Sequence, residues 1–152
     1  MKLFSISLCL LLLAVGSAIC VGELAVSAQT QQRKVAVGSV TDYASLIDKL
    51  RAAGVSVDAA GEVEQPFLSV TGKMIKLYSE DVQVFQYASA DEMEAQAAPI
   101  SPDGMAVGTR KIFWVGPPHF FKQGRLLVLY VGDNDKVLKA LEAVLGRQFA
   151  GQ

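Results

Sequence analysis

Residues 111–132, KIFWVGPPHFFKQGRLLVLYVG, are the most apolar part of the chain outside its N-terminus. The second half of this stretch holds an unbroken apolar run, residues 126–131, that is rich in β-forming types. A half-exposed strand would alternate apolar with polar residues, so this run predicts a strand covered on both faces, near the middle of a sheet. The whole stretch predicts a β-hairpin in which Gly124 supplies the positive φ of a turn over residues 122–124.

The composition is typical of a globular domain. The chain has 152 residues, of which 51% are hydrophobic, with 14 basic and 15 acidic side chains. Such a balance argues against intrinsic disorder. Lysines and arginines are scattered along the sequence and the net charge is close to zero, so nothing indicates a surface for nucleic acid. We therefore expect no nucleic-acid partner.

Residues 1–28 have the organisation of a secretory signal peptide. Lys2 supplies a positive charge, residues 3–21 are apolar apart from serines, and the segment ends in Val-Ser-Ala at Ala28. That ending suits the pocket of signal peptidase. We expect cleavage near Ala28, a mature chain that begins at Gln29, and an exported protein that is periplasmic, extracellular or attached to the envelope.

Two other fates of this segment stay open. Residues 3–21 are nearly long enough to span a bilayer as an uncleaved anchor. Lipid attachment at Cys20 is the second alternative, although Ile19 stands where the attachment pattern calls for a small residue. Both cysteines, Cys9 and Cys20, lie in this segment. A cleaved chain would therefore contain no disulfide and no thiolate metal site.

The remainder predicts a flexible tether over residues 29–40 and a single α+β domain over residues 41–152. Three amphipathic helices are expected, beginning after Thr41 or Asp42, after Ser89, and after Asp133 or Asn134. The expected strands outside the opening hairpin are short segments at residues 55–57, 73–78 and 82–87, the last two joined by a turn over 79–81. Residues 62–70 are expected to form another strand or an irregular edge. Residues 98–110 are expected to form a surface loop.

The order of these elements predicts the fold class. Two hairpins without strand–helix–strand alternation indicate an antiparallel sheet of about five to six strands, with three helices packed mainly on one face. Residues 78–97 can be aligned without gaps to residues 121–140, with Tyr87 opposite Tyr130. This alignment indicates either a ββα pseudo-repeat or merely a recurrent motif.

No constellation of catalytic or metal-binding residues emerges from the sequence. His119 is the only histidine, and no Gly-x-Ser-x-Gly motif accompanies it. Residues 133–135 begin like an EF-hand loop, but Leu138 and Val144 stand where glycine and glutamate are required. We therefore predict no catalytic residue, no cofactor and no metal site.

One segment does suggest an interaction surface, whose members are Trp114, Pro117, Pro118, His119 and Phe120. The prolines cannot donate to a sheet ladder, so they predict a stiff, kinked segment at the edge of the sheet. Rigid aromatic side chains beside a polar residue are typical anchors of an interface. The rival interpretation is that the prolines only protect a sheet edge against aggregation.

Three stretches, YSEDVQVFQYASADEMEAQAAPISPDG (78–104), WVGPPHFFKQGRLLVLYVGD (114–133) and LEAVLGRQFAG (141–151), carry a resemblance. The chain resembles, over about residues 55–151, a family of small bacterial exported or lipoprotein-like envelope proteins with similar EDVQVFEY, SPDG, WVGPPHF and GRLIVLYVGD segments. The resemblance implies a bacterial exported domain and brings no activity, cofactor or catalytic residue. Ile19-Cys20 departs from the lipid-attachment pattern of such relatives.

Together these features predict an exported envelope protein that binds rather than catalyses. The expected partner is a protein, a peptide or a small apolar ligand of the envelope, with membrane contact only through an uncleaved or lipidated N-terminal segment. One alternative is an inhibitor of an exported enzyme that presents a loop such as residues 99–108. The other is a hydrolase that uses His119 with carboxylates.

Overall fold

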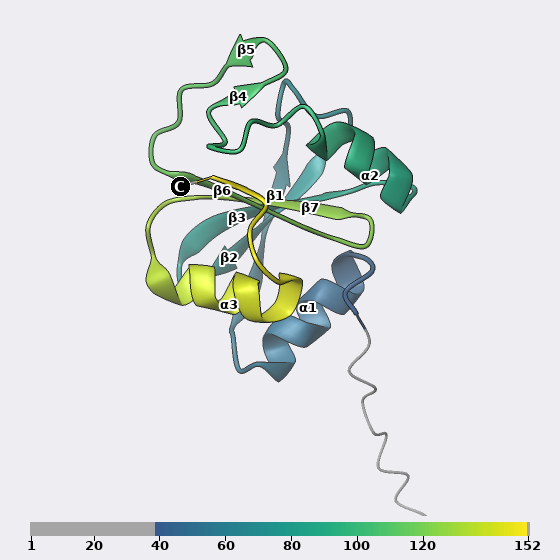
Figure 1. Cartoon of the computed structure of the whole chain (residues 1–152). Helices are drawn as coiled ribbons and strands as arrows, with labels where there is room; N and C mark the ends of the chain where they lie inside the picture. The colour runs from purple at the N-terminus through teal and green to yellow at the C-terminus, as the bar shows by residue number, and fades with distance from the viewer. Residues whose placement is uncertain (1–38, 152) are drawn as a thin grey trace, which may run out of the picture. The chain divides into compact units, whose positions relative to one another are not determined.

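Strand β7 (Leu126–Val131) lies in the middle of the main sheet, as its uninterrupted apolar sequence predicts. The computed structural model describes residues 39–151, all of which fall in one compact unit. Within it, β7 pairs on one side with β3 (Glu80–Gln86) and on the other with β6 (Pro118–Gln123) (Figure 1). All but the last residue of β7 are buried.

The predicted α+β class with an antiparallel sheet is confirmed. Six strands pair antiparallel in the order β1-β2-β3-β7-β6-β8, and a separate two-stranded sheet joins β4 and β5. The strands not yet introduced are β1 (Val57–Val63), β2 (Gly72–Leu77), β4 (Ala106–Val107), β5 (Arg110–Lys111) and β8 (Ala150–Gly151).

Helices cover both faces of the sheet. Helices α1 (Tyr43–Ala52) and α3 (Asp135–Leu145) pack on one face, against inward side chains of β7 such as Val128. Helix α2 (Ala90–Ala97) packs on the opposite face, against alternate residues such as Leu127 (Figure 1). The prediction that the helices lie mainly on one face therefore holds for α1 and α3 but not for α2.

The structure does not show the ββα pseudo-repeat. The order of two strands and a helix does recur, in β2-β3-α2 and in β6-β7-α3. Tyr87 and Tyr130, which the sequence alignment matched, nevertheless belong to the cores on opposite faces of the sheet. If the two ββα units were true repeats, a two-fold axis perpendicular to the sheet would relate them. Such an axis would place α2 and α3 on the same face of the sheet, which is not observed.

The helix boundaries follow the predicted caps. Asp42 caps α1, where its side chain accepts a hydrogen bond from the backbone of Ser45, and Ser89 caps α2 in the same way through Glu92. Asn134 caps α3. A side-chain oxygen at each of these positions satisfies a backbone N–H that the first turn of a helix leaves unpaired.

The turns of both long hairpins are shifted from the predicted positions, earlier in the chain between β2 and β3 and later between β6 and β7. The β2–β3 turn is formed by Tyr78 and Ser79, both at positive φ, instead of by residues 79–81. The β6–β7 turn is formed by Gly124 and Arg125 instead of by residues 122–124, although Gly124 does have the predicted positive φ of 58°. Two-residue turns of this kind match the right-handed twist of the paired strands.

Two strand boundaries also differ from expectation. The first arm of the opening hairpin becomes a strand only at Pro118, and residues 112–117 form an irregular segment. Of residues 62–70, expected to be a strand or an irregular edge, only 62 and 63 belong to a strand, the end of β1, and residues 64–71 form a loop. The predicted signal peptide over residues 1–28, the alternatives at 3–21 and Cys20, and most of the predicted tether lie outside the described residues. None of the helices within residues 39–151 is both long and apolar enough to span a membrane.

Candidate interaction surface

A row of four aromatic rings crosses the sheet face that also carries α2. Trp114 lies in the row, 6.0 Å from Phe67 and 6.0 Å from Phe120 between ring centroids, both in edge-on geometry. Phe149 continues the row at 6.2 Å from Phe120. Edge-to-face pairs at these distances are favourable because the positive ring edge meets the negative face of its neighbour. The row joins the loop at residues 64–71 to the segment 112–117 and to the C-terminal strand.

Trp114 is fixed by a hydrogen bond as well as by these edge-on aromatic contacts. Its indole Nε1–H donates to the backbone oxygen of Gly104 at 2.8 Å, and the side chain is half-buried. The sequence analysis placed Trp114 on an interaction surface, but its ring faces the core, where the indole N–H finds the partner that a buried donor needs. Trp114 therefore anchors the segment 112–117 to the sheet.

The two neighbours of Trp114 point the other way. Phe113 is 92% exposed and Val115 is fully exposed, whereas the other exposed large apolar side chain of the described residues, Tyr78, is 45% exposed. Because successive side chains of an extended segment alternate in direction, fixing Trp114 inward directs both neighbours outward. We call Phe113 and Val115 together the apolar tip. The sequence-based interaction surface included Trp114 but not Phe113, whereas the structure exposes Phe113.

The prolines hold the segment that follows the tip. Pro117 is half-buried and its carbonyl accepts a hydrogen bond from the N–H of Gly132 at 2.9 Å. Pro118 is buried and begins β6, opposite Val131 of β7. The predicted kinked segment is present, but it does not lie at a bare edge, because β8 pairs with the other side of β6 just beyond Pro118.

His119 is inside the protein, which corrects its assignment to an exposed surface. The residue is 5% exposed, and its imidazole stacks on the ring of Tyr130 with centroids 6.0 Å apart. Nδ1 lies 2.7 Å from Oε1 of Gln148, and Nε2 has no hydrogen-bond partner among the described residues. A general base must reach a proton of its substrate, and the burial of His119 separates it from any substrate in solution.

Phe120 is also wrongly placed by the sequence analysis. It is fully buried and packs between Trp114 and Phe149 in the aromatic row. β8 pairs with β6 at His119 and Phe120, which turns an expected edge into an interior strand. A two-residue strand such as β8 carries no hydrophobic pattern of its own, so the sequence gives no signal of it.

A hollow of about 330 Å³ opens beside the apolar tip. The residues that line it come from the loop after α2, from the β4–β5 hairpin and from the start of the segment 112–117, namely Ser101, Asp103, Met105, Ala106, Lys111, Ile112 and Phe113. Its one carboxylate is already engaged, because Asp103 accepts hydrogen bonds from the Ser101 hydroxyl and the Met105 backbone N–H. These two bonds hold the pKa of Asp103 below its ordinary value.

Two cations lie on β5, next to the tip in sequence. Arg110 and Lys111 are both exposed, and Lys111 lines the same hollow as Phe113. Within residues 39–151 neither side chain forms an ion pair. The arrangement therefore combines two exposed apolar side chains with two cations that have no acidic partner in the described part of the domain.

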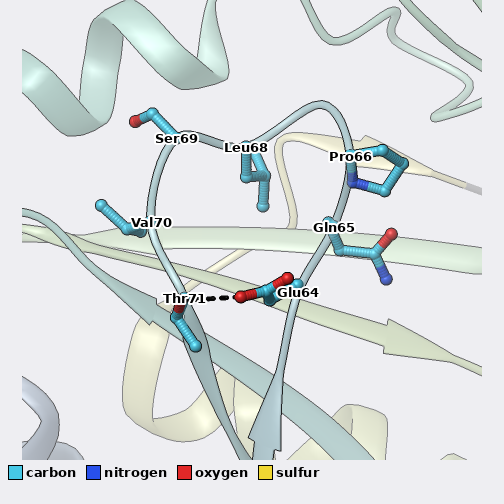
Figure 2. Close-up of a pocket in the computed structure, with 7 residues that line it drawn as sticks. All are labelled: Glu64, Gln65, Pro66, Leu68, Ser69, Val70 and Thr71. Atoms are coloured by element: carbon cyan, nitrogen blue, oxygen red, sulfur yellow. Dashed lines mark hydrogen bonds between the residues drawn. The ribbon is translucent and has the colours of Figure 1, made fainter.

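A second hollow of about 390 Å³ lies inside the loop between β1 and β2. Figure 2 shows its lining, which consists of residues of this one loop, with Leu68 and Val70 beside the polar groups. The Thr71 hydroxyl donates to Oε1 of Glu64 at 3.3 Å (Figure 2). The Ser69 N–H donates to Gln96 of α2 at 3.1 Å. These bonds brace the loop, and Glu64 is the only ionisable group in the lining.

The remaining chemistry of the described residues is limited. No group of three or more His, Cys, Asp or Glu residues that could hold a metal ion occurs between residues 39 and 151. Comparison of the chain with protein-family models, with curated proteins and with solved structures found no match. The resemblance to bacterial envelope proteins therefore stays a prediction.

Proposed function

We propose that this protein is an exported, non-enzymatic binding domain of the cell envelope, and that it makes contact through the apolar tip. The observation that carries the proposal is the outward direction of Phe113 and Val115 on a segment that the rest of the domain holds in place. Single exposed apolar residues are common on protein surfaces. Two such residues flanking a half-buried anchor are a stronger indication, because together they form one contact surface.

The bracing of the tip favours binding. Trp114 is held by a hydrogen bond and by two aromatic contacts, and Pro117 is bonded to Gly132. A segment that is already ordered loses little conformational entropy when a partner covers it. Aromatic residues and arginine, the types present here as Phe113 and Arg110, are also enriched at protein interfaces.

A non-catalytic role agrees with the position of His119. The only histidine of the chain is buried, and its hydrogen-bond partner is the amide of Gln148 rather than a carboxylate. A hydrolase built on His119 would need an accessible base oriented by a further group. The hydrolase alternative therefore has less support than binding.

The inhibitor alternative has one observation in its favour. The loop at residues 99–108, beside the tip, is cross-braced by backbone hydrogen bonds from Gly108 to Pro99 at 2.7 Å and from Ser101 to Ala106 at 2.8 Å. A rigid, exposed loop is what an inhibitor presents to an enzyme. An inhibitor would be a special case of the proposed binding function, in which the bound protein is an enzyme.

Site-specific cross-linking in the exporting cell tests the proposal. A photoreactive phenylalanine analogue replaces Phe113 in the full chain, and in a matched control it replaces Tyr78, the exposed aromatic of the β2–β3 turn. We expect adducts at position 113 and few at position 78. Absence of any adduct at position 113, in a chain that is exported and folded, would refute contact through the tip.

Export itself is tested by intact mass. The chain recovered from the envelope or medium is expected to begin at Gln29, as cleavage after Ala28 requires. A mass that retains residues 1–28, or a diacylglycerol adduct on Cys20, would replace cleavage by anchoring or lipidation. Either outcome would still leave the tip available for the cross-linking test.

A further inference from the structure

The surroundings of the apolar tip specify the class of partner more narrowly. Phe113 and Val115 project from the surface, since each is exposed over nearly its whole side chain, and only Phe113 borders the hollow beside the tip. A protein partner would need a matching concave site. A lipid bilayer accommodates projecting apolar side chains of any shape, because its acyl chains rearrange around them.

The charges beside the tip favour an anionic surface. Arg110 and Lys111 precede the tip by two residues or more, are exposed, and lack an ion pair within the described domain. The only carboxylate in the hollow beside Phe113 is that of Asp103, which accepts hydrogen bonds from Ser101 and Met105 and keeps its negative charge. Arg110 and Lys111 together exceed this single negative charge by one positive charge. Cations next to exposed aromatic and aliphatic side chains are the composition of segments that bind anionic membrane interfaces.

We infer that the apolar tip, with Arg110 and Lys111, inserts into the interface of a bilayer that contains anionic lipids. The inference depends on the proposed function, because it assumes that the tip is the contact surface, and it names the partner. It also departs from the sequence-based expectation of membrane contact only through the N-terminal segment. Phe113 and Val115 enter the boundary between headgroups and acyl chains, while the two cations remain at the headgroup phosphates.

The protein carries its own reporter for this contact. Trp114, the only tryptophan of the chain, lies between the two residues of the tip. Its fluorescence therefore responds to lipid at the tip and contains no tryptophan signal from the N-terminal segment, whatever that segment does. The full exported chain is mixed with vesicles of phosphatidylglycerol and phosphatidylcholine in equal parts, or of phosphatidylcholine alone. Emission and its quenching by acyl-chain bromines are measured.

The expected result is a blue shift and bromine quenching of Trp114 on the anionic vesicles, both weakened by added salt. Replacing both tip residues, Phe113→Ser with Val115→Ser, should lower the partition constant at least about 100-fold, because each apolar side chain that enters the interface contributes about a factor of ten or more. Replacing both cations, Arg110→Gln with Lys111→Gln, should lower the constant about 25-fold on anionic vesicles and leave the binding to neutral vesicles nearly unchanged.

Matched controls remove the same chemistry elsewhere. Lys136→Gln with Arg147→Gln takes two exposed cations from α3 and the turn that follows it, and Tyr78→Asn takes an exposed aromatic from the β2–β3 turn. Both controls should bind anionic vesicles like the unaltered chain. Equal losses in the control and tip variants would overturn the inference, because they would indicate general charge or hydrophobicity rather than insertion of the tip.

The outcomes separate this inference from the proposed function. Unchanged Trp114 emission on both kinds of vesicle, together with protein adducts at position 113, would leave a binding domain and remove the bilayer as its partner. Lipid adducts at position 113 with a vesicle response that needs Phe113 and Val115 would support both. Neither vesicle response nor any adduct would remove the tip as a contact surface altogether.

Discussion

Trp114 and its two neighbours should separate stability from binding within three consecutive residues. Trp114→Ala removes two edge-on aromatic contacts and one hydrogen bond to Gly104. Each aromatic contact contributes about 0.5–1.5 kcal/mol beyond the buried area, and the hydrogen bond about 0.5–1.5 kcal/mol. Replacing a fully buried tryptophan by alanine lowers the free energy of unfolding by about 3–5 kcal/mol. Because Trp114 is half-buried, we expect a loss of about 2–4 kcal/mol in the free energy of unfolding.

The replacement of Phe113 and Val115 by serine should have almost no effect on stability. Both side chains are exposed in the folded protein, so the change in free energy of unfolding should stay within about 0.5 kcal/mol. Trp114→Phe is the intermediate control, because it keeps a ring in the aromatic row but removes the indole N–H. It should cost less than the alanine variant.

Urea unfolding followed by far-UV circular dichroism measures all three variants, since the alanine and phenylalanine variants lack the tryptophan signal. Surface substitutions change the free energy of unfolding by no more than about 0.5 kcal/mol. A loss this small for Trp114→Ala would contradict its role as the anchor. A serine double variant that unfolds as easily as Trp114→Ala would show that the tip is packed in solution. Either result would refute the division of roles described above.

Three further predictions concern the core and the turns. Gly124→Ala and Gly54→Ala both place a side chain at positive φ, at a cost of about 1–2 kcal/mol, but only at Gly124 would the new Cβ approach backbone atoms of residues 40 and 41 to 2.8 Å. Gly124→Ala should therefore lower the free energy of unfolding by about 1–3 kcal/mol more than Gly54→Ala does, which appears as a lower urea midpoint. Equal midpoints would mean that residues 40–41 do not pack on this turn. Leu127→Ala, a truncation at a fully buried position of β7, should cost about 2–5 kcal/mol, and an unchanged midpoint would show that β7 is not central. Burial raises the pKa of Tyr87 to about 12, so the folded state favours the neutral phenol, while the phenol of the unfolded state ionises near pH 10. Between pH 10 and pH 12 the chain should therefore lose about 2–3 kcal/mol of stability that the Tyr87→Phe variant retains. Parallel profiles of stability against pH for the two proteins would contradict this.

Local patterns in the sequence determined the elements and the class of the fold. The apolar run at residues 126–131 predicted a central strand, because only a strand covered on both faces can be apolar throughout. Asp42, Ser89 and Asn134 predicted the helix starts, because a side-chain oxygen at a cap acts on the backbone within three residues. Both kinds of signal depend on neighbours in sequence, and both could be predicted without the tertiary structure.

The tertiary structure decided which face each element covers and which side chains reach solvent. α2 and α3 follow similar hairpins, yet they pack on opposite faces of one sheet, a choice that depends on contacts between distant segments. The pairing of β8 with β6 at His119 and Phe120 turned an expected edge into an interior strand. Trp114 turned inward because Phe67, Phe120 and the carbonyl of Gly104 meet there. Alternation could say that Phe113 and Trp114 face opposite ways, but only those long-range contacts determine which of the two is exposed, and therefore where the candidate surface lies.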